Sequence, residues 1–143
     1  MLKHTIIKKT EITCAVITLS DDLVVRVLIK KGIELTLTQL EVLFASINDL
    51  VAGHYYPVIY KTEDNNVIVG EGGVRFFKES ENLYPRACVA IVARSLSLKI
   101  IVNFYLKFKK ATTKSKVFNT EEDAEAWCYE QQKLINSSKL LVL

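Results

Sequence analysis

The residues that could act as a general base are few and widely separated. Imidazole fills that role most often in enzymes, and the chain has two histidines, His4 and His54. We expect residues 1–10 to be loose, which leaves His4 without a defined partner. His54 follows Gly53 at the end of a predicted helix, where the helix dipole by itself favours a cation. Both histidines are therefore interpreted as structural.

No sequence motif supplies an activated nucleophile or a metal pair. The chain contains neither a G-x-S-x-G turn nor an H-E-x-x-H helix, the usual local signatures of such sites. The carboxylates of Glu63 and Asp64 fall in a polar loop, and those of Glu121, Glu122 and Asp123 at a helix start. The sequence therefore predicts no catalytic residue, no metal and no cofactor, and an enzyme is the third choice of function.

The three cysteines also fit a structural role. Cys14, Cys88 and Cys128 lie far apart in the sequence, without metal-ligand spacing. Cys14 and Cys88 fall in apolar runs, where cysteine behaves as a small hydrophobic residue. We expect reduced thiols in a cytoplasmic protein.

A glycine-rich segment invites comparison with phosphate-binding loops. Residues 70–73 read Gly-Glu-Gly-Gly, but neither the Gly-Lys-Ser/Thr ending nor the G-x-G-x-x-G spacing is present. A loop that leads into a short helix, residues 74–79, is the better interpretation. A weak anion site at that helix start, formed by Gly72, Gly73 and Arg75, is the functional alternative.

A lysine-rich connection is predicted at residues 107–116. It contains five lysines and no acidic residue, so contact with anionic lipid or an acidic partner is one hypothesis. A solvated loop that follows a helix C-terminus is the favoured interpretation.

Composition limits the class of protein. The chain has 143 residues, 50% of them hydrophobic and 24% charged, with a formal net charge of +3. These values are typical of one folded domain, spanning 1–143, and give no reason to expect nucleic-acid binding. The sequence predicts neither a signal peptide nor a transmembrane segment, so we expect a cytoplasmic protein.

The pattern of apolar residues predicts alternating strands and helices. Residues 12–19 and 23–29 form a predicted antiparallel hairpin across the turn Ser20-Asp21-Asp22. A helix follows, with Thr36 or Thr38 as its N-cap, a single apolar stripe and Gly53 at its end. Further strands are predicted at 56–60, 87–93 and 116–118. Thr120 caps a last helix, and residues 137–143 form an apolar tail.

The segment 96–108 is a predicted helix with almost no polar side. A helix that is apolar all round must be buried on most faces, so the segment is expected in the core and in a subunit interface. The interface residues that we expect are Leu98, Ile101, Val102 and Tyr105, which implies self-association.

The element order β-β-α-β-α-β-α-β-α predicts an α/β fold. Its sheet should be mixed and mostly parallel, with the hairpin at the N-terminal side and helices packed against it.

Two stretches, residues 97–106 and 117–127, resemble small bacterial proteins with a SpoIIAA-like fold, grouped with STAS and CRAL-TRIO domains. The first reads Ser-Leu-Lys-Ile-Ile-Val-Asn-Phe-Tyr-Leu, and the second Val-Phe-Asn-Thr-Glu-Glu-Asp-Ala-Glu-Ala-Trp. The resemblance implies a SpoIIAA-like domain of uncharacterised function. No hydroxyl residue stands at the helix start after residue 73, so the phosphorylated switch residue of STAS domains is missing here.

Two functions are carried forward. The first is a non-catalytic regulatory or protein-interaction module of STAS-like type, which would act through the apolar helix and the loop 61–73. The alternative is a carrier that binds a lipid or another apolar small molecule, as CRAL-TRIO domains do.

Overall fold

The computed structural model describes residues 4–64, 68–69, 86–96, 99 and 114–142, with backbone alone for 68–69 and 136–142. Six strands form one sheet in the order β1-β2-β3-β5-β7-β8. Their bounds are β1 (Ile6–Glu11), β2 (Ala15–Ser20), β3 (Val25–Ile29), β5 (Val58–Thr62), β7 (Cys88–Val92) and β8 (Lys114–Phe118). A small parallel pair joins β4 (Glu34–Leu35) to β6 (Ile68–Val69).

The sheet confirms the predicted fold class. Strands β1, β2 and β3 pair antiparallel, and β3, β5, β7 and β8 pair parallel. The hairpin of β2 and β3 is the one that the sequence predicts. The bounds of every predicted strand shift by one to three residues: β2 begins at 15 and not 12, β3 at 25 and not 23, β5 at 58 and not 56, β7 at 88 and not 87, and β8 at 114 and not 116. In addition, residues 68–69 form a strand within the predicted loop.

The prediction that residues 1–10 are loose is wrong for the part that the structure describes. Residues 6–11 form the edge strand β1, because Ile6, Ile7 and Thr10 favour extended structure and β2 offers a free edge. The register shifts between Ile6 and Lys8. Such a bulge changes the face to which side chains point, and it sets Ile6 opposite Ser20.

The first helix, α1 (Leu37–Val51), matches the prediction at both ends. Thr36, and not Thr38, is the N-cap, and its side chain accepts a hydrogen bond from the Gln39 amide at 3.3 Å. All six residues of the apolar stripe are buried: Leu40, Leu43, Phe44, Ile47, Leu50 and Val51. The chain turns left-handed at Ala52 (φ 50°) and at Gly53 (φ 84°), where glycine avoids a steric penalty.

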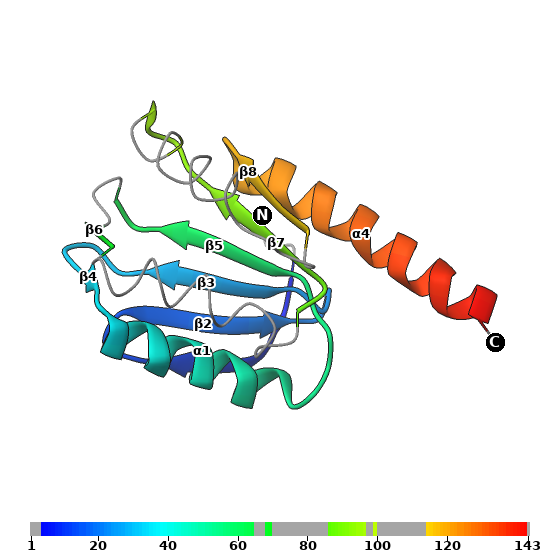
Figure 1. Cartoon of the computed structure of the whole chain (residues 1–143), viewed down its shortest axis with the longest axis horizontal. Coiled ribbons are helices and arrows are strands. Elements are labelled where there is room, and N and C mark those ends of the chain that lie inside the picture. The colour runs from blue at the N-terminus through cyan, green and yellow to red at the C-terminus, as the bar shows by residue number, and fades with distance from the viewer. Residues whose placement is uncertain (1–3, 65–67, 70–85, 97–98, 100–113, 143) are drawn as a thin grey trace.

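The last helix, α4 (Glu121–Val142), is longer than predicted. Thr120 caps it, because its hydroxyl accepts from the Asp123 amide at 3.1 Å. The predicted tail at 137–143 is wrong up to residue 142, since no proline or glycine interrupts the chain there and the leucines and lysine favour helix. The C-terminal end of α4 extends past the sheet (Figure 1).

Helices α1 and α4 cover opposite faces of the sheet (Figure 1). One core lies between α1 and the inward residues of β2 and β3, such as Ile17, Leu19 and Val27. The second core joins α4 to β5 and β7 and contains Ile59, Ala90 and Cys128 among its members. Because side chains alternate along a strand, the residues next to the α1 core, such as Thr18 and Arg26, face the α4 side.

Several predicted features lie outside the described residues. These are the short helix at 74–79, the anion site of Gly72, Gly73 and Arg75, and the interface residues Leu98, Ile101, Val102 and Tyr105. The start of the predicted helix 96–108 is described: the Lys99 amide donates to the Ser95 carbonyl at 3.0 Å, and Leu96 is 73% exposed. Within the described part of the chain, no helix is long and apolar enough to span a membrane.

Candidate functional site

The turn between β2 and β3 brings polar groups to the α4 side of the sheet. Leu23 adopts a left-handed conformation (φ 60°), which is unusual for a leucine. Its amide donates to the Ser20 carbonyl at 2.9 Å, and the Val24 amide donates to Asp22 Oδ1 at 3.2 Å. Gln132 of α4 donates its side-chain amide to the carbonyls of Asp22 and Leu23 at 3.2 and 3.3 Å. The turn is therefore fixed both from within and by the last helix.

Arg26 is the centre of an ion-pair network between β3 and α4. Its guanidinium donates two hydrogen bonds to the Asp22 carboxylate, at 2.8 and 3.2 Å, and one to Glu125. Its Nε lies 3.7 Å from Glu121, whose other oxygen accepts from Lys61 at 3.1 Å. The side chains of Arg26, Asp22 and Glu125 are only 16%, 11% and 14% exposed. Charges this buried need the paired arrangement seen here.

His4 lies against the same network from the N-terminal side. Its Nε2 is 3.3 Å from Glu125 Oε2, and its Nδ1 is 3.6 Å from Asp22 Oδ2. The hydroxyl of Tyr129 is 3.2 Å from Nε2 and donates to Asp22 Oδ2 at 2.7 Å. His4 thus connects the first strand to the last helix, across 125 positions of sequence.

The pKa values of Asp22 and Arg26 are shifted in the directions that keep both side chains charged. Burial alone would raise the pKa of Asp22, but hydrogen bonds from Arg26 and Tyr129 outweigh it and leave the pKa below its ordinary value. Burial opposes the charge of Arg26, yet its bonds to Asp22 and Glu125 hold its pKa above the ordinary value. Burial and the bond to the Asp22 carboxylate raise the pKa of Tyr129 to about 12. At neutral pH, Arg26 and Asp22 are therefore charged and Tyr129 is neutral.

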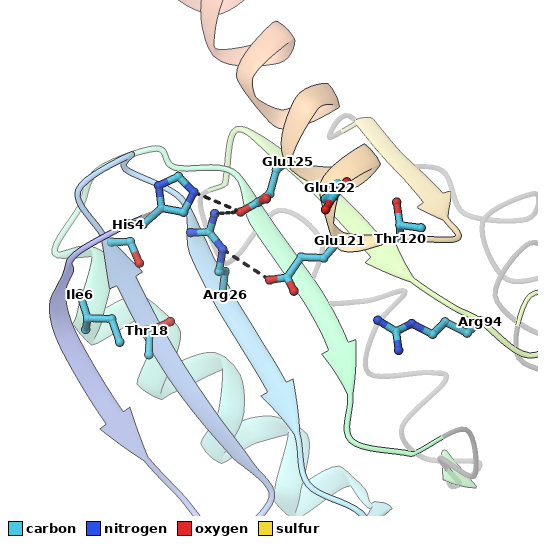
Figure 2. Close-up of a pocket in the computed structure, with 10 residues that line it drawn as sticks. His4, Ile6, Thr18, Arg26, Arg94, Thr120, Glu121, Glu122 and Glu125 are labelled. Atoms are coloured by element: carbon cyan, nitrogen blue, oxygen red, sulfur yellow. Dashed lines mark hydrogen bonds and ion pairs between the residues drawn. The ribbon is translucent and has the colours of Figure 1, made fainter. Parts of the chain in front are cut away.

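A cleft of about 590 Å³ opens beside this network, and we call it the α4 cleft. Figure 2 shows β1 and β2 residues on one side of it and the start of α4 on the other, with Arg94 well apart from His4 and Ile6. The described residues that line it are His4, Ile6, Thr18, Ser20, Arg26, Arg94, Thr120, Glu121, Glu122 and Glu125. The volume is in the range of small-molecule sites, but most of the residues that line the cleft have polar or charged side chains.

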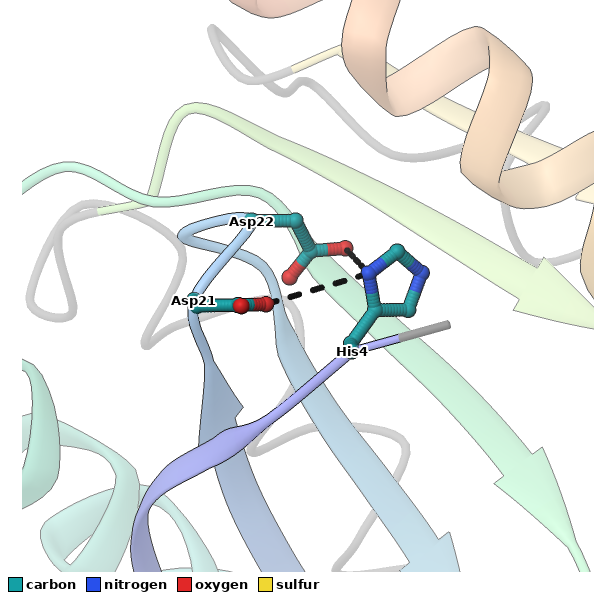
Figure 3. A group of neighbouring side chains, drawn as sticks. All are labelled: His4, Asp21 and Asp22. Atoms are coloured by element: carbon teal, nitrogen blue, oxygen red, sulfur yellow. Dashed lines mark ion pairs between the residues drawn. The ribbon is translucent and has the colours of Figure 1, made fainter. Parts of the chain in front are cut away.

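His4, Asp21 and Asp22 place potential metal ligands within 4.8 Å of one another (Figure 3). The arrangement does not favour a metal ion, because Asp22 already accepts from Arg26 and Tyr129. A cation at this point would have to displace a guanidinium that the network holds. The group is best described as part of the Arg26 network.

The cysteines lie away from any arrangement that would activate them. Cys14, Cys88 and Cys128 are free and buried. A hydrogen bond with Cys88 and burial raise the pKa of the Cys128 thiol, and burial raises that of Cys14. Since the thiolate is the reactive form, these side chains are suited to the core.

The sequence interpretation missed most of this site. It treated His4 as part of a loose end and Asp21-Asp22 as a turn signal, and it assigned no role to Glu125 or Tyr129. One signal was available: Arg26 is the single charge in an otherwise apolar strand. A lone buried charge requires a partner, but periodicity does not show which acid in the chain provides it.

Comparisons with known proteins add the family. A solved structure, an uncharacterised protein of the DUF3478 family with a SpoIIAA-like fold from Shewanella loihica PV-4, resembles the chain at 12% identity and a TM-score of 0.48. The match covers 90% of this chain and 97% of that one. No curated protein matches the sequence. A family model described as a domain of unknown function, DUF7793, matches residues 17–132. The chain therefore belongs to the DUF7793 family.

Proposed function

We propose that the domain is a non-catalytic regulatory or protein-interaction module that recognises its partner at the α4 cleft. The observation that carries the proposal is the lining of this cleft, in which Arg26 forms ion pairs with Glu121 and Glu125. Asp22, next to the lining, forms a further ion pair with Arg26. A general base must be able to exchange a proton with a substrate. Asp22 and Glu125 instead stabilise the guanidinium, so they serve to shape a surface.

Photo-crosslinking tests whether a partner occupies the cleft. Ile6 is replaced with benzoylphenylalanine, because its side chain lines the cleft and is 53% exposed. Tyr55 is the matched control, since it is an exposed aromatic residue (62%) outside the cleft lining. We expect irradiation of cells to give one dominant protein adduct from position 6 and none of the same mass from position 55.

A charge reversal decides whether that adduct is specific. Glu122→Lys changes an exposed residue of the cleft wall, and Glu130→Lys changes an exposed residue of the same helix outside the lining. The adduct should disappear with the first variant and persist with the second. Equal yields from the two variants, or no adduct at position 6, would contradict the proposal.

The carrier hypothesis and self-association are separated from this proposal by native mass spectrometry. A carrier would retain an acyl chain, whereas all the described residues that line the α4 cleft except Ile6 have polar or charged side chains. We expect a protein free of bound lipid. We also propose that segment 96–108 mediates self-association, in which case Ile101→Asp reduces the subunit count or prevents folding. A retained lipid would favour the carrier instead.

A further inference from the structure

The α4 cleft contains a buried hydroxyl group that has no hydrogen-bond partner among the described residues. Ser20 is 4% exposed and lines the cleft. Its backbone amide donates to Val24 and its carbonyl accepts from Leu23, but its hydroxyl makes no hydrogen bond with any residue that the structure describes. A buried polar group left unpaired is costly, so such a group usually bonds to a water molecule or a ligand.

The hydroxyl of Ser20 points towards the cleft together with that of Thr18. Leu19, between them on β2, belongs to the α1 core, and alternation therefore turns Thr18 and Ser20 to the opposite face. The register of β1 places Ile6 opposite Ser20. One side of the cleft thus offers two hydroxyl oxygens and, beside them, the half-exposed apolar side chain of Ile6.

The facing wall of the cleft is acidic. Glu121, Glu122 and Glu125 belong to the first two turns of α4 and all line it. Three cations of the described structure oppose these carboxylates. Arg26 is also neutralised by Asp22, Lys61 is bonded to Glu121, and Arg94 lies at the end of the cleft away from Ile6 (Figure 2). The part of the cleft next to Ser20 therefore attracts a cation and repels an anion.

We infer that this part of the α4 cleft binds a primary alkylammonium group. An ammonium carries three donors and no acceptor, which matches the hydroxyl oxygens of Ser20 and Thr18 and Oε1 of Glu125. Arg26 and His4 contact the other carboxylate oxygen of Glu125, Oε2. Its methylene stem would lie along Ile6, as the stems of lysine side chains commonly do on apolar surfaces. A divalent metal is less suited, because Arg26 bonds to the same carboxylate of Glu125 and repels a double charge.

The chemistry has two sources: a free small amine and the lysine side chain of a partner protein. The second source rests on the proposed function, because it makes the recognised partner a protein with an exposed lysine at the contact. Either source would present the same ammonium to the same oxygens. The experiment must therefore include a probe for each.

The test is an NMR titration of the full chain at pH 7, followed through the backbone amides of Ile6, Thr18, Ser20 and Glu125. The probes are cadaverine for the free amine and Nα-acetyl-lysine amide for the side chain. The control ligand is 1,5-pentanediol, which has the same stem without the charge. We expect saturable shifts with at least one amine and none with the diol. The probe that binds more tightly identifies which of the two sources supplies the ammonium group.

Two variants test the oxygens. Ser20→Ala removes a hydroxyl that makes no bond within the described structure, so the fold should persist while the dissociation constant rises about tenfold or more. Thr18→Val, at a partly buried position, is a second variant with the same expected direction. Ser46→Ala is the control, because that hydroxyl bonds to Val42 within α1, on the other face of the sheet.

The inference is overturned by three results: no saturable amine shifts at the cleft, equal effects of the diol, or unchanged binding in both Ser20→Ala and Thr18→Val. These results are distinct from failure of the proposed function. A specific crosslink at position 6 together with no amine binding would retain the interaction module and reject the ammonium site.

Discussion

The carboxylate of Asp22 accepts hydrogen bonds from two elements, the β2–β3 hairpin and helix α4. It accepts from Arg26 on its own hairpin and from Tyr129 on α4, and it also caps the turn through the Val24 amide. Few single side chains in the described structure connect as many elements. Its protonation state therefore affects both the turn and the docking of the last helix.

Stability should depend on the ionisation of Asp22. Its pKa is lower in the folded protein than the ordinary value near 3.9. The stabilisation is therefore present above about pH 4 and is lost as the pH falls through the folded pKa. Urea unfolding should show Asp22→Asn to be less stable than the parent by about 2 kcal/mol at pH 7.

That difference should shrink as the pH is lowered from 5 to 3. Asp49→Asn is the matched control, because Asp49 is exposed on α1, and it should change stability by less than about 0.5 kcal/mol. A constant difference between Asp22→Asn and the parent over the whole range would show that the charge of Asp22 contributes nothing.

Tyr129 gives an independent spectroscopic signal from the same network. Its pKa is raised to about 12, compared with about 10 for an ordinary tyrosine. Its contribution is present below about pH 10 and is lost as the pH rises towards 12. An absorbance titration near 295 nm should show a late-ionising tyrosine that is absent from Tyr129→Phe. Identical late steps in the two proteins would remove Tyr129 from the network.

Among the elements, α1 offers the sharpest test of a local rule. The sequence left Thr36 and Thr38 open as its N-cap, and the structure selects Thr36. Thr36→Ala should lower the free energy of unfolding by about 1 kcal/mol, because an orphan amide loses its acceptor. Thr38→Ala should be neutral or slightly stabilising, since alanine is the better helix former. The opposite ranking in thermal or urea unfolding would contradict this cap.

Elements that obey a strong local period could be predicted from the sequence. The stripe of α1 and the hairpin of β2 and β3 are such cases, since each buries one face and repeats at 3.6 or 2 residues. Strand β1 could not be predicted in this way. None of its six residues is buried, and its bulge breaks the alternation, so the sequence pattern looks like a loose end.

The candidate site could not be predicted for a different reason. Most of its members come from three places in the chain: the N-terminus, the first hairpin and the last helix. Arg26 and Glu125 are 99 positions apart, and nothing in the sequence around either residue specifies the other. The contact results from the sheet order and from α4 packing on β5 and β7.

At the scale of the whole molecule, the Arg26 network links the N-terminal segment and the first hairpin to helix α4. Strand β1 approaches α4 through His4, and the hairpin approaches it through Asp22 and Arg26. The α4 cleft lies along this junction. If the junction is rigid, the cleft is preformed, and a partner does not have to order it on binding.

The direct test of this junction is a double-mutant cycle between Arg26→Met and Glu125→Gln, measured by urea unfolding at pH 7. The exposed pair Lys30 and Glu11, which lie 2.8 Å apart, is the control cycle and should show no measurable coupling. We expect a coupling energy of about 1–3 kcal/mol for Arg26 and Glu125. Additive effects of the two substitutions would mean that α4 does not depend on this ion pair and that the cleft is not held in a preformed shape.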